Sequence, residues 1–137
     1  MSDREFQFEV ITPDRVVLQD DTVVSVIVPG SEGHLGVLAN HAPMMAELAI
    51  GKLDFRRSDG KTGKMAICGG FVEVFENSVS VLAEAAELAE DIDVERAEES
   101  KKRASERLKT AGPDVDRARA EAALQRAINR LKIARQT

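Results

Sequence analysis

The tripeptide Gly60-Lys61-Thr62 has the residue types that end a phosphate-binding loop, where backbone N–H groups and a lysine hold nucleotide phosphates. That motif requires its first glycine at position 55, and the sequence has Phe55 there. Asp59-Gly60 is a common turn dipeptide between two strands. The sequence therefore predicts a hairpin turn with a solvated lysine at this point, not a phosphate loop.

Cys68 with His34 or His41 has the residue types of a thiol nucleophile and its base. Cys68 stands within an apolar strand pattern, however, and no recognised nucleophile motif surrounds it. One cysteine and two histidines also fall short of a metal-ligand spacing. The sequence predicts a buried, inert thiol, no catalytic residue and no metal site.

Residues 28–43, with the sequence VPGSEGHLGVLANHAP, carry glycines at three-residue intervals, at Gly30, Gly33 and Gly36. Glycine permits positive φ angles and close approach of the backbone, so this segment is predicted to be a shaped loop. Two interpretations stay open at this point. The loop either presents a contact surface or serves only as a turn between strands.

The composition is that of a folded protein, with 43% hydrophobic and 31% charged residues. A net charge of −5 argues against general binding to nucleic acid, which needs a basic face. No stretch approaches the roughly 18 consecutive apolar residues of a membrane span, and the first ten residues do not resemble a signal peptide. Together with the single cysteine, these features predict a soluble protein of a reducing compartment.

The elements that must position these residues change type along the chain. All five Phe and eight of the nine Gly lie in the first half, where apolar and polar residues alternate, as in residues 6–11 and 71–75. Turn signals separate these segments and predict about eight to ten short strands in an antiparallel sandwich. We place the domain boundary between residues 86 and 87.

From Asp93 the apolar period becomes helical, with Ala97, Ala104, Leu108 and Ala111 on one face of a first helix. Gly112-Pro113 should end this helix, and Asp114 or Asp116 can cap a second. The inward stripe of the second helix comprises Leu124, Ala127/Ile128, Leu131 and Ala134. The predicted fold class is thus α+β, an N-terminal antiparallel β-sandwich (residues 1–86) followed by an antiparallel two-helix hairpin (residues 87–137).

The predicted hairpin has a thin apolar interface. Residues 93–137 contain nine alanines but only seven Val, Leu or Ile, and no Phe or Met. A buried methyl contributes about 0.8 kcal/mol, against about 1.5 to 3 kcal/mol for a buried Leu or Ile. The hairpin is therefore marginal by itself, and it is either permanently docked or able to detach and straighten.

Three sequence features together carry a resemblance to a known family. They are the pattern PGxxGxxGVLxxHAP at residues 29–43, the pattern GGFVEV at residues 69–74 followed by VxVLA at residues 79–83, and the terminal helical pair. Over nearly its whole length the chain resembles the epsilon subunit of bacterial F-type ATP synthases. The resemblance implies a sandwich that binds the gamma subunit and sits on the c-ring, and a hairpin that regulates ATP hydrolysis.

The resemblance also gives individual residues a role. Ile92, Asp93, Arg96 and Ala97 match a motif that binds ATP in some members of that family, with Glu87 at the upstream acidic position. Arg126 and Arg130 match its paired arginines, and like charges at i,i+4 repel each other unless a partner compensates them. The alternative is that Asp93 only caps the helix and the arginines are solvated. Glu32 and His34 are expected to face the c-ring, and His41 to lie nearer gamma.

The function that the resemblance implies is that of a non-catalytic rotor subunit. Its expected partners are gamma, the c-ring and, through extended C-terminal helices, the alpha and beta subunits. Its expected location is peripheral, on the cytoplasmic face of the bacterial cell membrane, with no required cofactor and ATP as a candidate regulatory ligand. The rival hypotheses are a free-standing ATP sensor of similar fold and a small hydrolase, which would need a catalytic dyad that the sequence does not show.

Overall fold

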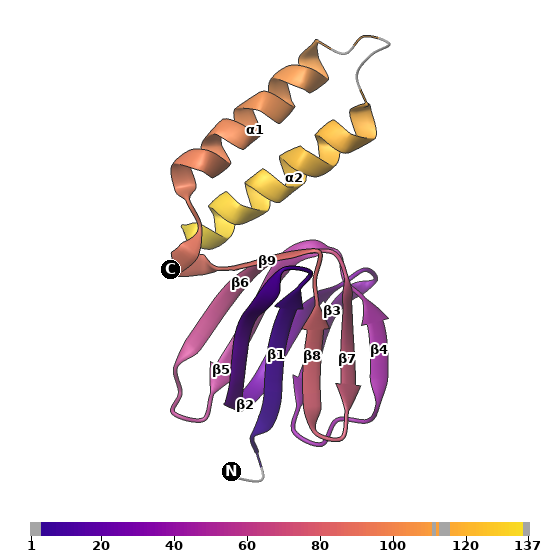
Figure 1. Ribbon diagram of the computed structural model, residues 1–137, viewed down its shortest axis with the longest axis vertical. Coiled ribbons are helices and arrows are strands. Elements are labelled where there is room, and N and C mark those ends of the chain that lie inside the picture. Colours follow the sequence, from indigo (N-terminus) through magenta and orange to yellow (C-terminus); the bar gives the residue numbers. More distant parts are fainter. Residues whose placement is uncertain (1–3, 111, 113–115, 136–137) are drawn as a thin grey trace. The chain divides into compact units, whose positions relative to one another are not determined.

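A computed structural model describes residues 4–110, 112 and 116–135 of the chain. The chain divides into two compact units between Leu88 and Ala89, a strand unit and a helical unit (Figure 1). The boundary expected between residues 86 and 87 falls inside the last strand, Ala85–Leu88. Each unit is described by itself below.

The strand unit contains nine strands in the part of the chain that is described, within the expected eight to ten. They are β1 (Phe6–Thr12), β2 (Arg15–Gly30), β3 (Gly33–Leu38), β4 (Met44–Glu47), β5 (Ile50–Arg57), β6 (Thr62–Cys68), β7 (Phe71–Phe75), β8 (Ser78–Leu82) and β9 (Ala85–Leu88).

Strand β2 organises the sheet because it is 16 residues long and pairs with three other strands. Its first part pairs with β1, and its second part pairs with β3 and β5. The strand order is β4-β7-β8-β1-β2-β5-β6-β9, with β3 paired to β2 beside this path. All pairs are antiparallel except β1 with β8, which are parallel. The antiparallel prediction is thus wrong for this one pair, which joins residues about 70 positions apart.

Both layers of the unit contribute large apolar side chains to one core. The ring centroids of Phe8 on β1 and Phe55 on β5 lie 5.7 Å apart, although β2 separates these strands in the sheet. Facing rings from non-adjacent strands mean that the sheet closes over itself as a sandwich. Around them lie the fully buried Phe6, Leu53, Met65 and Ile67, and valines of β1, β2, β3, β7 and β8.

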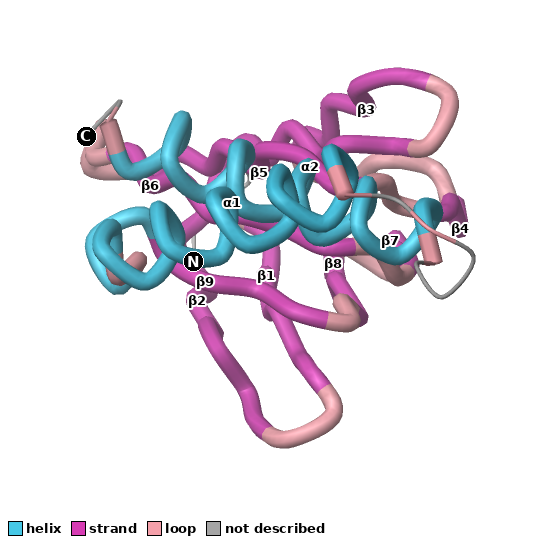
Figure 2. Tube along the Cα trace, turned by 90° about the horizontal axis from the view of Figure 1, so that it is seen from above, coloured by secondary structure: helices cyan, strands magenta, loops and turns pink. Residues whose placement is uncertain are grey.

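The period-two alternation explains why these residues form strands. Phe6, Phe8 and Val10 are buried, whereas Gln7 between them is exposed. The β1–β2 hairpin reaches beyond the neighbouring strands of the unit (Figure 2). Its turn at Pro13-Asp14 is stabilised by Thr12, whose hydroxyl donates to the Asp14 carboxylate over 2.6 Å. This hydrogen bond lowers the pKa of Asp14.

The helical unit begins with a 3₁₀ turn (η1, Ala89–Asp91) and continues with α1 (Val94–Lys109) and α2 (Arg117–Ala134), which run side by side (Figure 1). The Asp93 side chain caps α1 and the Asp116 side chain caps α2, each accepting from a backbone N–H three residues on. Of the two predicted caps of the second helix, Asp116 is the one observed, and Asp114 lies outside the described residues, as do Ala111 and Pro113.

Small side chains dominate the buried positions of the two helices. Ala97 and Ala104 are buried on α1, as predicted, and α2 buries Ala120, Ala127, Leu131 and Ile133. Ile128 is 44% exposed, so Ala127 alone occupies the inward position for which both residues were candidates. Neither helix has the length and apolar character needed to cross a bilayer, within the residues that are described.

Candidate functional site

The nucleotide-binding prediction rests on residues at the start of α1 and in the second half of α2. Asp93 is exposed, and its Oδ1 accepts from the backbone N–H of Arg96 over 3.1 Å. This bond satisfies one of the N–H groups left open at a helix start. The Arg96 side chain is exposed as well, while Ile92 and Ala97 are buried and anchor this first turn.

Arg126 and Arg130 both lie on α2 and are partly buried. Two contacts show how α2 is aligned with α1. Arg135 pairs with Glu98 near the start of α1, and Arg117 donates to the Leu108 carbonyl near the end of α1. The helices are therefore antiparallel, and Arg130 is the nearer of the two arginines to the start of α1. Within the described residues, Arg126 has no hydrogen bond or ion pair.

Glu87, the remaining member of the predicted nucleotide set, belongs to the strand unit. It lies on β9 opposite Ala66 of β6 and is partly buried. The other six residues belong to the helical unit. The role of all seven in binding ATP stays a prediction.

The β2–β3 turn carries two of the three predicted contact residues. Glu32 and His34 are exposed and line one hollow of about 540 Å³ together with residues 44–47 of β4. The Ser31 N–H donates to the Glu47 carbonyl over 2.9 Å and holds the turn against β4. Gly33 has φ +132°, a conformation that few other residues adopt. The turn is thus a fixed, shaped surface.

His41 lies apart from that hollow, on the segment between β3 and β4. Its backbone N–H donates to the Leu38 carbonyl over 3.3 Å, and its Nδ1 lies 2.7 Å from the Ala42 carbonyl. The ring is partly buried, and the Ala42 carbonyl orients it. The structure therefore brings Glu32 and His34 together and places His41 elsewhere.

Sequence reasoning missed a row of apolar side chains on the outer face of the sheet. The register pairs Phe71 of β7 with Leu82 of β8, Leu82 with Ile11 of β1, and Ile11 with Val16 of β2. Phe71, Leu82 and Val16 are 49%, 46% and 56% exposed, and Ile11 is partly buried. We call these four residues the apolar row. Contiguous exposed apolar surface is common where proteins contact another macromolecule.

A signal for this row was present in the sequence. In residues 71–75 the valines at positions 72 and 74 are buried, so Phe71 and Phe75 share the opposite face with Glu73. The alternation alone was therefore enough to place Phe71 and Phe75 on the outer face of β7, an inference that the sequence analysis did not draw. The other members of the row become neighbours only through the pairing of β8 with β1, which the sequence did not reveal.

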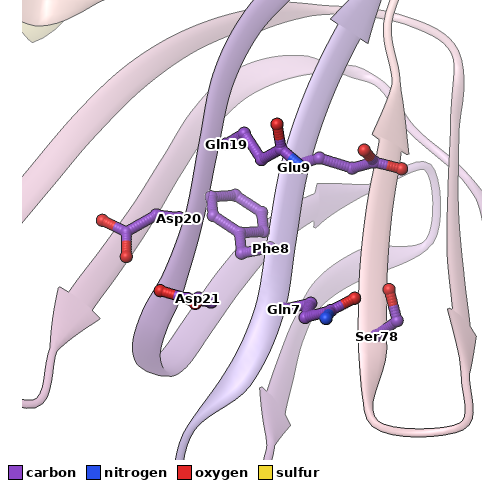
Figure 3. A pocket seen from close by; sticks show the side chains of 7 residues that line it. All are labelled: Gln7, Phe8, Glu9, Gln19, Asp20, Asp21 and Ser78. Atoms are coloured by element: carbon purple, nitrogen blue, oxygen red, sulfur yellow. The ribbon is translucent and has the colours of Figure 1, made fainter. Parts of the chain in front are cut away.

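A pocket of about 420 Å³ on β1, β2 and β8 is lined by Glu9, Asp20 and Asp21 (Figure 3). These three carboxylates point in different directions and do not converge on one point (Figure 3). Glu9 accepts from the Ser80 hydroxyl over 2.9 Å, and Asp20 is bound by Thr22 and Arg57. The pocket shows neither a cation site nor an acid–base pair.

Asp20 has a structural role. Its Oδ2 accepts from Arg57 Nε over 2.6 Å, and its Oδ1 accepts from both the N–H and the hydroxyl of Thr22. Burial raises the pKa of Asp20, but the hydrogen bonds from Thr22 and Arg57 outweigh this effect and hold the pKa below its usual range. The carboxylate is therefore ionised at neutral pH and fixes Arg57.

The two catalytic motifs considered from the sequence have structural roles. Gly60 lies in the β5–β6 turn, where the Asp59 carboxylate accepts from the Lys61 N–H over 2.9 Å. The predicted hairpin turn is confirmed. Cys68 is buried at the end of β6, also as predicted.

Comparison with known proteins agrees with this architecture. The family model described as "ATP synthase, Delta/Epsilon chain, beta-sandwich domain" matches residues 5–89, and "ATP synthase, Delta/Epsilon chain, long alpha-helix domain" matches residues 90–135. The chain belongs to the delta/epsilon family of ATP synthase subunits.

Within this family the chain is similar to bacterial epsilon chains. It is 52% identical over 108 residues to the ATP synthase epsilon chain of Pelotomaculum thermopropionicum, covering 79% of each chain. The epsilon chain of Koribacter versatilis is 47% identical over 108 residues, covering 79% of this chain and 75% of that one. A chain of the Euglena gracilis mitochondrial ATP synthase, solved as OSCP/F1/c-ring, matches with TM-score 0.81 and 25% identity over 98% of this chain and 82% of its own. The predicted resemblance is confirmed.

Proposed function

We propose that the chain is a non-catalytic rotor subunit of a proton-translocating F-type ATP synthase. In this role it links gamma to the c-ring and inhibits ATP hydrolysis through its C-terminal helices. It is peripheral, on the cytoplasmic face of the bacterial cell membrane, and is held there by its partners. Membership of the epsilon chains and the likeness to a chain solved with F1 and a c-ring support this proposal.

The single observation that carries the proposal is the apolar row. Three of its four side chains are about half exposed, and they lie on adjacent strands of a rigid sheet. Leaving such a surface in water is unfavourable, by roughly 25 cal/mol for each Å² of apolar area. Gamma is the partner that we assign to this face.

The β2–β3 turn is assigned to the c-ring. Glu32 and His34 are exposed and polar, and the bond from Ser31 to Glu47 keeps their turn in one position. Exposed polar side chains on a fixed turn suit contacts to polar loops, which need hydrogen bonds more than buried area. His41, on its separate segment, is assigned to the gamma side.

The helical unit is assigned to regulation because little apolar surface holds its two helices together. Four of its six buried helical residues are alanines. Such a hairpin separates at low cost and can then extend toward the alpha and beta subunits. A compact and an extended form would differ in which groups they present, so a ligand specific to one form would shift the population.

ATP is the ligand that we assign to the compact form. Arg126 and Arg130 are partly buried at i,i+4 on α2, a spacing that lets both guanidinium groups serve one anion. Guanidinium groups bind phosphate oxygens with bidentate geometry. Asp93 and Arg96 would serve the rest of the nucleotide, and Ile92 and Ala97 would hold the helix start in place.

Co-purification tests the rotor assignment. The full chain should be isolated with gamma, and a chain ending at residue 88 should still fold and bind gamma, because the core and the apolar row lie in the strand unit. Changing Phe71 and Leu82 to Ser should remove gamma binding without unfolding the chain. Recovery of the wild-type chain alone, with ATP bound, would instead support a free-standing sensor.

Calorimetry tests the nucleotide assignment. Replacing Arg126 and Arg130 by Ala should abolish ATP binding to the isolated chain and relieve inhibition in the assembled enzyme. A matched control is Arg103→Ala with Arg107→Ala, which removes the same charge at the same spacing from exposed positions of α1. Unchanged ATP affinity in the Arg126/Arg130 variant would remove the nucleotide site from the proposal, and undiminished inhibition would remove the docking role of these arginines.

A further inference from the structure

The strand unit has a further hollow, of about 760 Å³, that the proposed contacts do not use. Three arginines line it, namely Arg4, Arg56 and Arg57, together with Leu38, Asn40 and Ser58. None of the lining residues that the structure describes is acidic. We call this hollow the arginine pocket.

The charge of this pocket is opposite to that of the segment that forms it. Residues 1–83 contain seven Lys or Arg against twelve Asp or Glu, and three of the seven line this one hollow. The excess of arginines in the lining attracts anionic groups, although Asp20 compensates part of the charge of Arg57. The pocket therefore favours an anionic ligand, although the protein as a whole has a net charge of −5.

Arg57 is held in one orientation before any ligand arrives. Its Nε donates to Asp20 over 2.6 Å, and its guanidinium carbon lies 5.1 Å from the centroid of the Phe55 ring. The Nε–H is committed to Asp20, so the terminal N–H groups of the same plane are the ones that can serve a ligand. A guanidinium fixed in this way loses little conformational entropy on binding.

The opposite wall of the pocket is fixed by Asn77, from the turn between β7 and β8. Its Oδ1 accepts from the Asn40 N–H over 2.8 Å, and its Nδ2 donates to the Glu5 carbonyl over 3.0 Å. Ser58 in turn donates its hydroxyl to the Glu5 carboxylate over 2.7 Å. Segments from four distant parts of the sequence are thus tied together around the hollow, which keeps its shape.

The apolar part of the lining indicates what kind of anion fits. Leu38 is 64% exposed and lies in the same lining as the arginines. A free inorganic anion would pair with the arginines and leave Leu38 in water. A protein segment with an acidic residue next to an apolar one would satisfy both, because arginine forks match carboxylates and aliphatic side chains cover Leu38.

We propose that the arginine pocket receives an acidic side chain, flanked by an apolar residue, from a segment of the gamma subunit. The pocket would then be a second, charge-selective contact beside the apolar row, and it would set the rotational register of the sandwich on its partner. The identity of the partner rests on the proposed function. The chemistry of the segment rests on the pocket alone.

The test uses the full chain and a head complex of alpha, beta and gamma that lacks this subunit. Affinity is measured by fluorescence titration at about 50 mM and about 300 mM salt, since added salt screens exposed charge pairs. Arg56→Gln should weaken binding about fivefold at the lower salt, and Arg56→Glu about twentyfold. Arg56 is exposed, so neither change should alter the melting temperature.

Lys61→Gln is the matched control, because it removes the same charge from an exposed residue of the adjacent β5–β6 turn that does not line the pocket. Its effect should stay below about twofold. Equal losses for Lys61→Gln and Arg56→Gln, or no loss in either Arg56 variant while the wild-type chain binds, would overturn the arginine pocket as a contact.

A charge exchange identifies the partner residue. Replacing one acidic residue of gamma by Lys should recover most of the affinity lost in Arg56→Glu, and failure of every such replacement would overturn the proposal. Failure of the wild-type chain to bind the head would overturn the proposed function and this inference with it. A different result is that the Arg56 variants bind gamma as the wild type does and lose binding only to vesicles of anionic lipid. That result would assign the pocket to a membrane surface and would also overturn the proposal.

Discussion

The strand unit and the helical unit differ in what they bury. The strand unit encloses phenylalanine, leucine, methionine, isoleucine and many valines, whereas the helices bury chiefly alanine. Because burial free energy scales with apolar area, the two units have very different resistance to opening. The comparison indicates a chain in which one part keeps its shape while the other can change.

The largest expected effect comes from a glycine in the connection between β6 and β7 of the strand unit. Gly70 has φ +102°, and a Cβ atom there would lie 2.0 Å from the Leu82 carbonyl oxygen. Gly70→Ala should therefore lower the free energy of unfolding by about 4 kcal/mol, combining backbone strain with a steric clash. A Cβ at Gly112 of the helical unit meets nothing within 4 Å, so Gly112→Ala should change stability little. Chemical denaturation of both variants makes the measurement, and equal losses would contradict the comparison.

The next effect uses the same substitution in each unit. Leu53 is 0% exposed in the sandwich core, and Leu53→Ala should cost about 3 kcal/mol and speed hydrogen exchange throughout the strands. Leu131→Ala, at a residue 2% exposed on α2, should speed exchange only within the helices. Exchange that rises across the strands in the Leu131 variant would show that the two units open together.

Features that depend on residues close together in the sequence were the ones predicted correctly. The alternation of Phe6, Phe8 and Val10 predicted β1, because this signal depends on residues a few positions apart. Asp116 was one of two candidate caps of the second helix, and capping by Asp93 was the alternative to a nucleotide role. The pairing of β1 with β8 depends on how distant strands meet in three dimensions. The apolar row was therefore not predicted from the sequence. The ties that Asn77 makes to Asn40 and Glu5 were invisible for the same reason.

The candidate sites divide in the same way. Residues 28–43 were predicted to be a shaped loop, but residues 28–30 and 33–38 belong to strands β2 and β3. The prediction holds only for the turn between these strands, where Gly33 has a positive φ. The arginine pocket draws on residues 4 to 60, and its charges are scattered in a sequence whose first half is acidic overall. The nucleotide-binding residues were named from the family resemblance. Their spacing in the sequence, without that resemblance, does not identify a nucleotide as the ligand.

Removing an ion pair from each unit is expected to lower stability less than the core substitutions do. In the strand unit the loss depends on pH. Asp20→Asn should cost about 1.5 kcal/mol at neutral pH, because the charge-assisted bond to Arg57 is lost. The folded pKa of Asp20 lies below its ordinary value of 3.8, so ionisation stabilises the fold above that value. The difference between wild type and variant should therefore shrink as the pH falls through the lowered pKa.

The control for this experiment is the ion pair of the helical unit. Glu98 and Arg135 have side chains 47% and 63% exposed, and exposed pairs contribute little. Glu98→Gln should leave the melting temperature unchanged at every pH. A pH-independent loss in the Asp20 variant would mean that shape, not charge, is what Asp20 supplies.

The smallest expected effect lies within α1. Ala104→Gly replaces a buried alanine by the residue with the greatest backbone freedom and should cost the helix about 1 kcal/mol. Circular dichroism should show a lower helix content, and strand exchange rates should not change. The same substitution at Ala122, a partly buried position inside α2, separates propensity from lost packing, and equal costs would mean that Ala104 packs no better than Ala122.

The parallel pairing of β1 with β8 has a mechanical consequence. Five register pairs, from Gln7 with Ser78 to Ile11 with Leu82, run in the same direction along the two strands. Tension applied to the start of β1 and to the end of β8 acts along the strands in opposite directions. All the hydrogen bonds between them then bear the load at once, whereas a hairpin pulled at its open end yields one bond at a time. The sandwich thus has a shear clamp between its first strand and its last strand but one.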